Sequence, residues 1–374
     1  MPRLNVGFIT PALYWGGAER WMLDLARWSR SRLHWTGCAS VFPMHDDDTM
    51  VGHFARLMPV HVARRLGHRR AVAKVAAQAD CLICWGAYPL RELVGDFAGP
   101  IVFVSHGSGR FDREAAAFAV SGATHYAAVA RAAMPPLLAA GVPRDKITVL
   151  HNGIDPGRVH AFRPRSAVRR ELGAEGRCLV GFIGRMVPEK NPVAVAEAVA
   201  RLPDRYRAVF VGGGWDLDAQ RAAVREVLGP RAIFIDRTEA VGDYYAALDV
   251  FALGSEREGF SMGMLEAMWH RIPCALTNVG VLPELERAHG RHWEVIAPGG
   301  AQDRDRVAGE LAAAIRRIDV LLGGAIRQKR TAAARALVGE RFLAANMADR
   351  WVDYVRRIVL EWRDDRKKTR PVDT

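Results

Sequence analysis

Short apolar runs alternate with longer stretches in which apolar positions recur at helical spacing, from one end of the chain to the other. Between residues 18 and 30, for example, Trp21, Leu25 and Trp28 fall on one face of a helix. Strand-like runs separated by helical stretches predict parallel sheets covered by helices, which is the α/β fold class. We predict strands at 4–10, 35–42, 80–84, 101–105, 125–130, 147–151, 179–183, 208–211, 232–235, 249–253 and 274–277.

The alternation is interrupted between Asp155 and Glu171, where prolines, a glycine and several arginines follow one another. A chain of 374 residues suits two domains of about 150–200 residues each. We therefore predict two Rossmann-like, doubly wound domains, over residues 1–160 and 165–344. A further helix is predicted within 342–362, because one helical face there carries Met347, Trp351, Val355, Ile358 and Trp362. The charged tail 363–374 is expected to be disordered.

Bulk composition places the chain among globular proteins, with 50% hydrophobic and 25% charged residues. No apolar stretch approaches the roughly 18–20 residues that a membrane span requires. Met1-Pro2-Arg3 leads directly into a predicted strand, so we expect no signal peptide. We expect a cytoplasmic protein, or one bound peripherally to the inner face of the plasma membrane. Cys81 and Cys84 have the spacing of a redox pair, but strand positions three apart face opposite sides, so both are expected in the core.

The net charge of +12 indicates an acidic partner: a phosphorylated donor, an anionic lipid surface or nucleic acid. Nucleic acid is disfavoured because the chain carries no zinc module, RNA-recognition signature or basic zipper. One local segment combines cations with apolar residues and could rest on anionic lipid, each cation contributing about 1 kcal/mol. The alternative is a solvated helix face. The cations are Arg64, Arg65, Arg69, Arg70 and Lys74, and the apolar residues are Leu66, Val72 and Val75.

The segment from Ser255 to Met268 carries the most informative chemistry of the chain. A strand-like run enters an acidic turn that contains Glu258, and a helical pattern with Glu266 follows. Free N–H groups near Ser261 and Gly263 would face an anion at the helix start. Glu258 could then accept hydrogen bonds from sugar hydroxyls, and Glu266 from a ribose. The alternative is ordinary helix capping by carboxylates.

Two further segments suit the same kind of ligand. In the loop before Pro192, Arg185 offers a planar fork of donors and Lys190 a mobile charge, a pair that matches a diphosphate. A solvated basic loop is the alternative. Near the N-terminus, Gly16 and Gly17 follow a predicted strand and open a helix, where glycine lets the backbone approach a ligand.

In this order the three motifs resemble those of the retaining glycosyltransferases of the GT-B fold, specifically family four. The resemblance covers about residues 4–360, and further landmarks are Ser105-His106-Gly107, Asn152-Gly153-Ile154-Asp155, Val211-Gly212-Gly213-Gly214, and Asn278-Val279-Gly280 followed by Glu284. The resemblance implies two domains that face each other across a cleft, the second binding a nucleotide sugar. It also implies that the C-terminal helix, residues 345–362, crosses back to the first domain.

The resemblance further implies transfer of a hexosyl group from a nucleotide sugar, a UDP-sugar first and a GDP-sugar second, to a hydroxyl of a glycan or lipid-linked acceptor. Cell-envelope or exopolysaccharide synthesis is the expected setting. His106 would contact the donor sugar, its alternative being a loop histidine that caps the next helix. Arg237 and Thr238 would lie along the nucleobase. The remaining donor-binding positions are Gly16, Gly17, Phe260, Ser261, Met262, Gly263 and Glu266.

No residue stands out as a covalent nucleophile, and the resemblance implies transfer on the same face, so we expect retention by front-face displacement. With Arg185 and Lys190 neutralising the phosphates, no metal is expected, and the acidic cluster Asp46-Asp47-Asp48 is interpreted as a surface turn. Two alternatives remain: a nucleotide-sugar epimerase of the same architecture, and a catalytically silent sugar-nucleotide-binding protein. A dinucleotide-dependent dehydrogenase is disfavoured, because no Gly-x-Gly-x-x-Gly opens the first domain.

Overall fold

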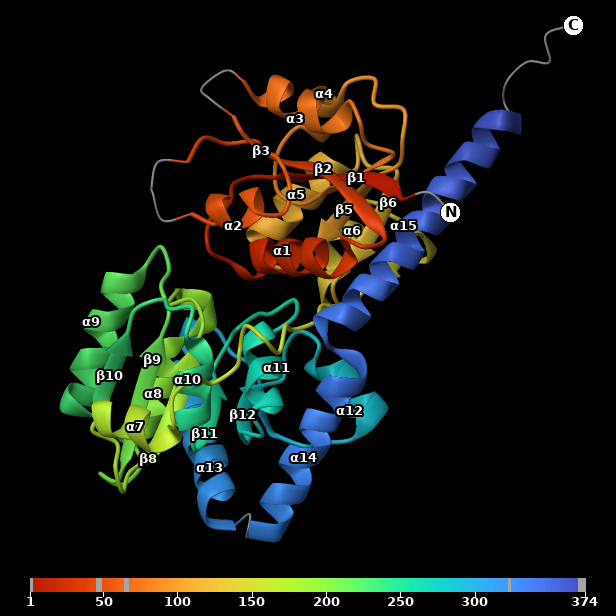
Figure 1. Ribbon diagram of the computed structural model, residues 1–374. Helices are drawn as coiled ribbons and strands as arrows, with labels where there is room; N and C mark the ends of the chain where they lie inside the picture. Colours follow the sequence, from red (N-terminus) through yellow and green to blue (C-terminus); the bar gives the residue numbers. More distant parts are fainter. Residues whose placement is uncertain (1–2, 45–48, 64–66, 322–323, 369–374) are drawn as a thin grey trace, which may run out of the picture. The chain divides into compact units, whose positions relative to one another are not determined.

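The computed structural model describes residues 3–44, 49–63, 67–321 and 324–368. The chain forms two compact units (Figure 1), the first comprising Met1–Gly153 with Ala344–Thr374 and the second Ile154–Leu343. Each unit contains one parallel sheet with helices packed on it, which confirms the predicted pair of doubly wound α/β domains.

The sheet of the first unit has the strand order β3-β2-β1-β4-β5-β6-β7. Its central strands are almost wholly apolar because helices cover both faces. The strands are β1 (Leu4–Thr10), β2 (Leu33–Ser40), β3 (Val60–Val62), β4 (Cys81–Cys84), β5 (Ile101–Ser105), β6 (His125–Ala128) and β7 (Ile147–Val149). The helices are α1 (Gly17–Ser29), α2 (Val51–Ala55), α3 (His68–Ala76), α4 (Leu90–Val94), α5 (Arg110–Ala119), α6 (Pro135–Ala139) and α15 (Ala344–Lys368).

Helix α15 returns to the first unit, as predicted (Figure 1). Its apolar face is buried, and the ring of Trp351 lies 5.2 Å from that of Trp21 on α1. Farther along, the Trp362 indole donates to the Ala98 carbonyl at 2.7 Å, and Arg363 pairs with Asp80 at 2.6 Å. The prediction of disorder from residue 363 was therefore wrong for 363–368, which these contacts hold in the helix. Residues 369–374 lie outside the described part of the chain.

The sheet of the second unit has the strand order β10-β9-β8-β11-β12-β13. Its strands are β8 (Cys178–Ile183), β9 (Tyr206–Val211), β10 (Ala232–Ile235), β11 (Val250–Leu253), β12 (Cys274–Thr277) and β13 (Glu294–Ile296). Its helices are α7 (Arg165–Glu171), α8 (Pro192–Ala200), α9 (Leu217–Leu228), α10 (Val241–Ala247), α11 (Met262–Trp269), α12 (Leu282–His289), α13 (Arg304–Arg316) and α14 (Gly324–Arg341).

The boundary between the units falls at Gly153 and Ile154, just before the segment in which the sequence pattern is interrupted. Ile154 donates its N–H to the Phe342 carbonyl at 2.8 Å and forms an isolated parallel bridge with Leu343. The outgoing and returning chain segments therefore lie side by side where the second unit begins and ends.

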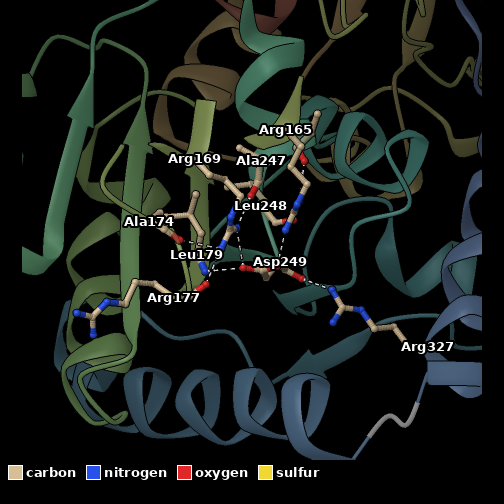
Figure 2. A network of polar contacts seen from close by, with 10 residues as sticks. Arg165, Arg169, Ala174, Arg177, Leu179, Ala247, Leu248, Asp249 and Arg327 are labelled. Carbon is tan, nitrogen blue, oxygen red and sulfur yellow. Dashed lines mark hydrogen bonds and ion pairs between the residues drawn. The ribbon is translucent and has the colours of Figure 1, made fainter. Parts of the chain in front are cut away.

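The arginines of the interrupted segment build the edge at which the strands of the second sheet begin (Figure 2). Arg165 and Arg169 bind the Asp249 carboxylate at 2.5 and 2.9 Å and also donate to carbonyls at the end of α10. Arg327 donates to the backbone carbonyl of Asp249 at 2.8 Å. Since the last carbonyls of a helix lack partners within it, the guanidinium groups of Arg165 and Arg169 satisfy them and anchor α10.

Three other sequence-based expectations can be compared with the fold. All five cysteines are buried free thiols, as expected for Cys81 and Cys84. Arg69, Arg70 and Lys74 are exposed on α3, whereas Val72 and Val75 are fully buried in the unit. The apolar side of this segment therefore packs on the protein core and cannot enter a lipid layer; Arg64, Arg65 and Leu66 lie outside the described residues. Within the described chain, no helix has the length and hydropathy of a membrane span.

Candidate functional site

The loops that follow β8, β9, β10 and β11 leave the same edge of the second sheet, because the strands are parallel. After β8, Arg185 is exposed and makes no ion pair within the described chain. A short turn, Pro188–Lys190, follows, and Asn191 adopts a left-handed conformation with φ of 52°. The Asn191 side chain caps α8 by accepting from the Ala194 N–H at 3.3 Å. The loop thus presents Arg185 and Lys190 on a turn of fixed shape.

A chain of polar contacts fixes the carboxylate of Glu258 beside this loop. Lys190 Nζ lies 2.5 Å from Glu258 Oε2, and Ser255 Oγ donates to Glu258 Oε1 at 2.9 Å. The backbone carbonyl of Ser255 accepts from Thr277 Oγ1 at 2.7 Å. Lys190 and Glu258 are 19% and 9% exposed in their side chains, so the pair is largely shielded from water. Each oxygen of the carboxylate therefore has a donor that sets its orientation.

Gly280, the last residue of the Asn278-Val279-Gly280 motif, packs against the acidic turn that contains Glu258. Its φ is 64°, a conformation that side chains disfavour. A Cβ atom at this position would lie 2.8 Å from Cβ of Glu258 and 3.0 Å from the carbonyl oxygen of Gly259. Only glycine therefore lets this segment pack directly against the turn that holds Glu258.

Helix α11 begins next to the end of β8. Ser261 is its N-cap and accepts from the Met264 N–H at 3.4 Å. A Cβ atom at Gly263 would lie 3.0 Å from the Ile183 carbonyl oxygen, which shows how closely the helix start approaches β8. The first N–H groups of a helix, here at Met262 and Gly263, have no acceptor inside it and favour an anion. Glu258, Ser261 and Thr277 also line a small cavity at this edge.

Glu266 is placed differently from the expectation of a carboxylate open to a ribose. It is 6% exposed, forms an ion pair with Arg158, and accepts from the Tyr245 hydroxyl at 2.8 Å. Burial, together with the Glu266 charge, raises the pKa of Tyr245 well above its usual value, so the phenol remains a donor. A carboxylate has roughly four acceptor positions, and two are used here. Sequence reasoning missed Arg158 and Tyr245, since neither stands in a recognised motif.

Phe260 also differs from the expectation of a donor-binding side chain. Its ring is 7% exposed and lies 5.8 Å from that of Phe342. The side chain therefore belongs to the core of the second unit.

The glycines after β9 are required by close backbone packing. A Cβ atom at Gly212, whose φ is 143°, would lie 2.0 Å from the Gly184 carbonyl oxygen. The Met186 N–H donates to the Gly213 carbonyl at 2.7 Å. The glycine loop therefore runs along the loop that carries Arg185. On its other side, Arg237 is exposed and Thr238 accepts from the Ala240 N–H at 3.1 Å, which gives Thr238 a structural role.

In the first unit, Gly16 and Gly17 open α1 directly after the loop that follows β1. Gly16 is the N-cap and supplies no side-chain cap. Within the described residues, a Cβ atom at Gly17 would meet nothing closer than 4 Å. The start of α1 is therefore accessible at Gly17.

His106 follows β5 and lies between two indoles. Its ring is 4.9 Å from that of Trp21 and 5.5 Å from that of Trp85, both edge-on. The residue is half-buried, and its Nε2 is buried with no hydrogen-bond partner in the part of the chain that the structure describes. Burial lowers the pKa of His106 to about 3, so the ring is neutral near pH 7. The start of α5 is instead satisfied by Asp112, which accepts from the Gly109 N–H at 2.8 Å, so His106 is not a helix cap.

The predicted site residues thus form two groups, each within one unit. Arg185, Lys190, Glu258, Ser261 and Gly263 meet at one sheet edge of the second unit. The first unit contains Gly17 and His106, each at the carboxyl end of a strand. Among the described residues, no three His, Cys, Asp or Glu side chains cluster as a metal ion would require. Residues 46–48 lie outside the described chain.

Two family models match the chain in consecutive segments. One, described as Glycosyltransferase Family 4, matches residues 15–158. The other, described as Glycosyl transferases group 1, matches residues 177–318. The matched segments contain Gly16, Gly17 and His106 in the first case, and Arg185, Lys190 and Glu258 in the second.

Curated relatives match over shorter stretches. A GDP-mannose-dependent alpha-mannosyltransferase of Mycobacterium tuberculosis is 29% identical over 160 residues, which is 42% of this chain and 40% of the relative. A lipopolysaccharide core biosynthesis mannosyltransferase of Rhizobium meliloti is 28% identical over 148 residues, 37% of this chain and 42% of the relative. The chain thus spans less than half the length of these relatives.

Solved structures match over nearly the whole chain at low identity. Anabaena HepE in complex with UDP and glucose superimposes with a TM-score of 0.77 at 22% identity, covering 95% of this chain and 100% of HepE. A glycosyltransferase of Rickettsia africae gives a TM-score of 0.78 at 17% identity, covering 96% of this chain and 99% of the other. At these identities the likeness concerns the fold.

Proposed function

The chain belongs to the group 1 glycosyltransferases of the GT-B fold, and on this premise we propose that it transfers a hexosyl group from a nucleotide sugar to a hydroxyl of a glycan or lipid-linked acceptor. The observation that carries the proposal is the grouping of Arg185, the Lys190–Glu258 pair and the start of α11 at one sheet edge. Such an edge is where doubly wound sheets bind their ligands.

The diphosphate of the donor is proposed to bind Arg185, Lys190 and the first N–H groups of α11. Arg185 has no competing carboxylate in the described chain, and its guanidinium can bind two phosphate oxygens at once. Lys190 already faces a carboxylate, so its ammonium is held in place before the donor arrives. Preorganised donors of this kind each contribute about 2.7–4 kcal/mol to the transition state. This positive charge is the basis for proposing that no metal is needed.

The transfer is proposed to retain the anomeric configuration. In such a step the bond between the anomeric carbon and the diphosphate oxygen breaks while the bond to the acceptor oxygen forms on the same face. The acceptor proton passes to the departing phosphate oxygen. Glu258 would accept hydrogen bonds from the sugar hydroxyls, a role that its fixed carboxylate suits. His106, whose ring is neutral near pH 7, is proposed to contact a further sugar hydroxyl.

Glu266 and the nucleobase region complete the proposed donor site. Two acceptor positions of the Glu266 carboxylate are taken by Arg158 and Tyr245, and a ribose hydroxyl could use another. Arg237 would lie along the base. UDP is proposed first and GDP second. HepE was solved with UDP and with UDP-glucose, and a curated relative is named as GDP-mannose-dependent, so both nucleotides have support.

The acceptor and the setting are proposed from the relatives alone. One relative is named for lipopolysaccharide core biosynthesis and another for teichuronic acid biosynthesis. We propose cell-envelope or exopolysaccharide synthesis at the inner face of the plasma membrane. The exposed cations Arg69, Arg70 and Lys74 would supply an electrostatic contact with anionic lipid, without insertion of the buried apolar face of α3.

The proposal is tested by product analysis. The protein is incubated with a panel of UDP- and GDP-sugars and a bacterial lipid extract, and products are identified by mass spectrometry and by the anomeric proton in NMR. We expect a glycosylated lipid with retained configuration, absent with Glu258→Gln. Epimerised donor formed without acceptor would favour the epimerase alternative. Equal background hydrolysis by wild type and Glu258→Gln, with no product, would favour a silent binding protein.

A further inference from the structure

Trp215 is among the most exposed large apolar side chains of the described chain, with 72% of its surface open. It follows Gly214 directly and precedes α9. In the described residues its ring makes no ring contact, cation contact or hydrogen bond with another side chain. An indole left open to water at a sheet edge is costly in free energy, because its large apolar face is not buried.

The position of Trp215 is fixed by the glycine loop before it. A Cβ atom at Gly214, whose φ is 150°, would lie 2.8 Å from the Met186 carbonyl oxygen, so the loop runs against the residues that follow Arg185. On the other side, a Cβ atom at Gly213 would lie 4.0 Å from Cβ of Arg237. The strand order β10-β9-β8 likewise puts this loop between those of Arg237 and Arg185. Trp215 therefore stands between the proposed diphosphate site and the proposed base site.

The charges around Trp215 indicate which part of a nucleotide would meet it. Asp216 and Asp218 follow it at the start of α9, and Asp216 accepts from Gln220 at 2.8 Å. The carboxylates of Asp216 and Asp218, which follow Trp215 by one and three positions, would repel a phosphate, whereas Arg185 on the neighbouring loop after β8 would attract one. A flat, uncharged group fits this position, and a nucleobase has such a face for stacking on indole.

We infer that Trp215 binds the nucleobase of the donor by stacking, which makes it a residue that determines affinity for the nucleoside part rather than for the diphosphate. This inference rests on the proposed function and extends it. Stacking contacts the face of a base and not the hydrogen-bonding groups on its edge. Trp215 therefore strengthens the binding of both UDP and GDP, and other residues must distinguish the two bases.

The test is isothermal titration of the full chain with UDP, GDP and inorganic pyrophosphate, comparing wild type with Trp215→Ala and Trp215→Phe. Truncation to alanine is expected to weaken UDP and GDP about five- to hundredfold, while pyrophosphate binding stays unchanged. Phenylalanine keeps an aromatic face and should preserve most of the affinity. Ile326→Ala is the matched control, since Ile326 is 56% exposed on α14 beside Arg327 and away from the loops of the proposed site.

Unchanged UDP and GDP affinity in Trp215→Ala would overturn the inference, and so would an equal loss of pyrophosphate binding. If nucleotide binding requires Arg185 but not Trp215, this inference fails and the proposed function stands. If the wild-type protein binds neither nucleotide, the proposed function fails and the inference falls with it.

Discussion

Lys190 Nζ lies 2.5 Å from Glu258 Oε2, although the two residues are 68 positions apart in the sequence. The pair joins the loop after β8 to the loop after β11, and Ser255 holds the second oxygen of the carboxylate. The cation proposed to bind the diphosphate and the carboxylate proposed to bind the sugar hydroxyls are thereby fixed next to each other.

Separate substitutions of this pair should have different effects. Lys190→Ala leaves a carboxylate that is 9% exposed without its counter-charge, and should lower the free energy of unfolding by about 1–3 kcal/mol. It should also weaken UDP and pyrophosphate binding. Glu258→Gln keeps the Lys190 charge, so nucleotide binding should persist while transfer is lost. Denaturant unfolding and calorimetry measure these effects.

Arg257→Ala is the control for the pair, because Arg257 stands in the same turn, is largely exposed and pairs only with Glu256 among the described residues. It should leave both binding and stability nearly unchanged. Undiminished UDP affinity in Lys190→Ala would contradict the role assigned to the ammonium group.

Alanine substitutions at Gly280 and Gly290 can be compared to separate two effects. One is the loss of stability caused by a side chain in a left-handed backbone conformation, and the other is a change at the turn that holds Glu258. The φ values of the two glycines are 64° and 74°, so alanine at either should lower the free energy of unfolding by about 1–2 kcal/mol. Only at Gly280 would the added Cβ lie 2.8 Å from Cβ of Glu258; at Gly290 it meets nothing among the described residues. Gly280→Ala should therefore also lose transfer activity, measured at a temperature where both variants are folded. Equal activity in the two variants would show that the Glu258 turn tolerates the displacement.

Burial of His106 has a consequence for stability at acidic pH. Its pKa is about 3 in the folded chain and about 6.5 in the unfolded chain. Between these values the unfolded chain holds a proton that the folded chain lacks, so the contribution of His106 to stability, full above pH about 6.5, is lost as pH falls. The free energy of unfolding should thus fall less steeply with acidification in His106→Gln.

NMR gives a direct reading of the same group. The His106 imidazole signal, assigned by its absence in His106→Gln, should not titrate between about pH 5 and 8. A titration midpoint near pH 6.5 would mean that the His106 ring is exposed to water and that burial does not lower its pKa.

Electrostatic binding to lipid can be tested on α3. Replacing Arg69 and Arg70 together by glutamine should weaken binding to phosphatidylserine vesicles by about 30-fold, taking each cation as about 1 kcal/mol. Phosphatidylcholine vesicles should bind neither protein. The matched control replaces Arg144 and Lys146 by glutamine; these are two exposed cations of the same unit on the turn before β7. An equal loss with both pairs would indicate a dependence on net charge and not on α3.

The fold could be predicted because strand and helix patterns differ in period over several residues. The bounds of β1, β5, β10 and β12 agree with the prediction. The edge strands β3 and β13 were missed; each has three residues, too few to display a period. The edge strand β7 is equally short, and it was predicted within the longer range 147–151. On α3 the pattern identified an amphipathic segment, but period alone does not say whether its apolar side faces a core or a membrane.

Site residues were recognisable where they directly follow a strand, as Arg185 and Glu258 do. Arg158 could not be recognised, because its partner Glu266 is 108 positions away and no motif surrounds it. Phe260 stands inside a recognised motif, yet the sequence gives no indication that Phe342 covers its ring. Sequence motifs thus indicated which loops lie at the site, but they did not indicate which side chains contact one another there.

The central claim is that this chain binds a nucleoside diphosphate through Arg185 without a metal ion. Arg185 and Arg177 are exposed arginines beyond opposite ends of β8, so Arg177→Ala is the matched control. Calorimetric titration with UDP in the presence of EDTA should show binding by wild type and by Arg177→Ala, and binding weakened at least about tenfold in Arg185→Ala. Equal UDP affinity in all three proteins, or no binding until a divalent cation is added, would contradict the account.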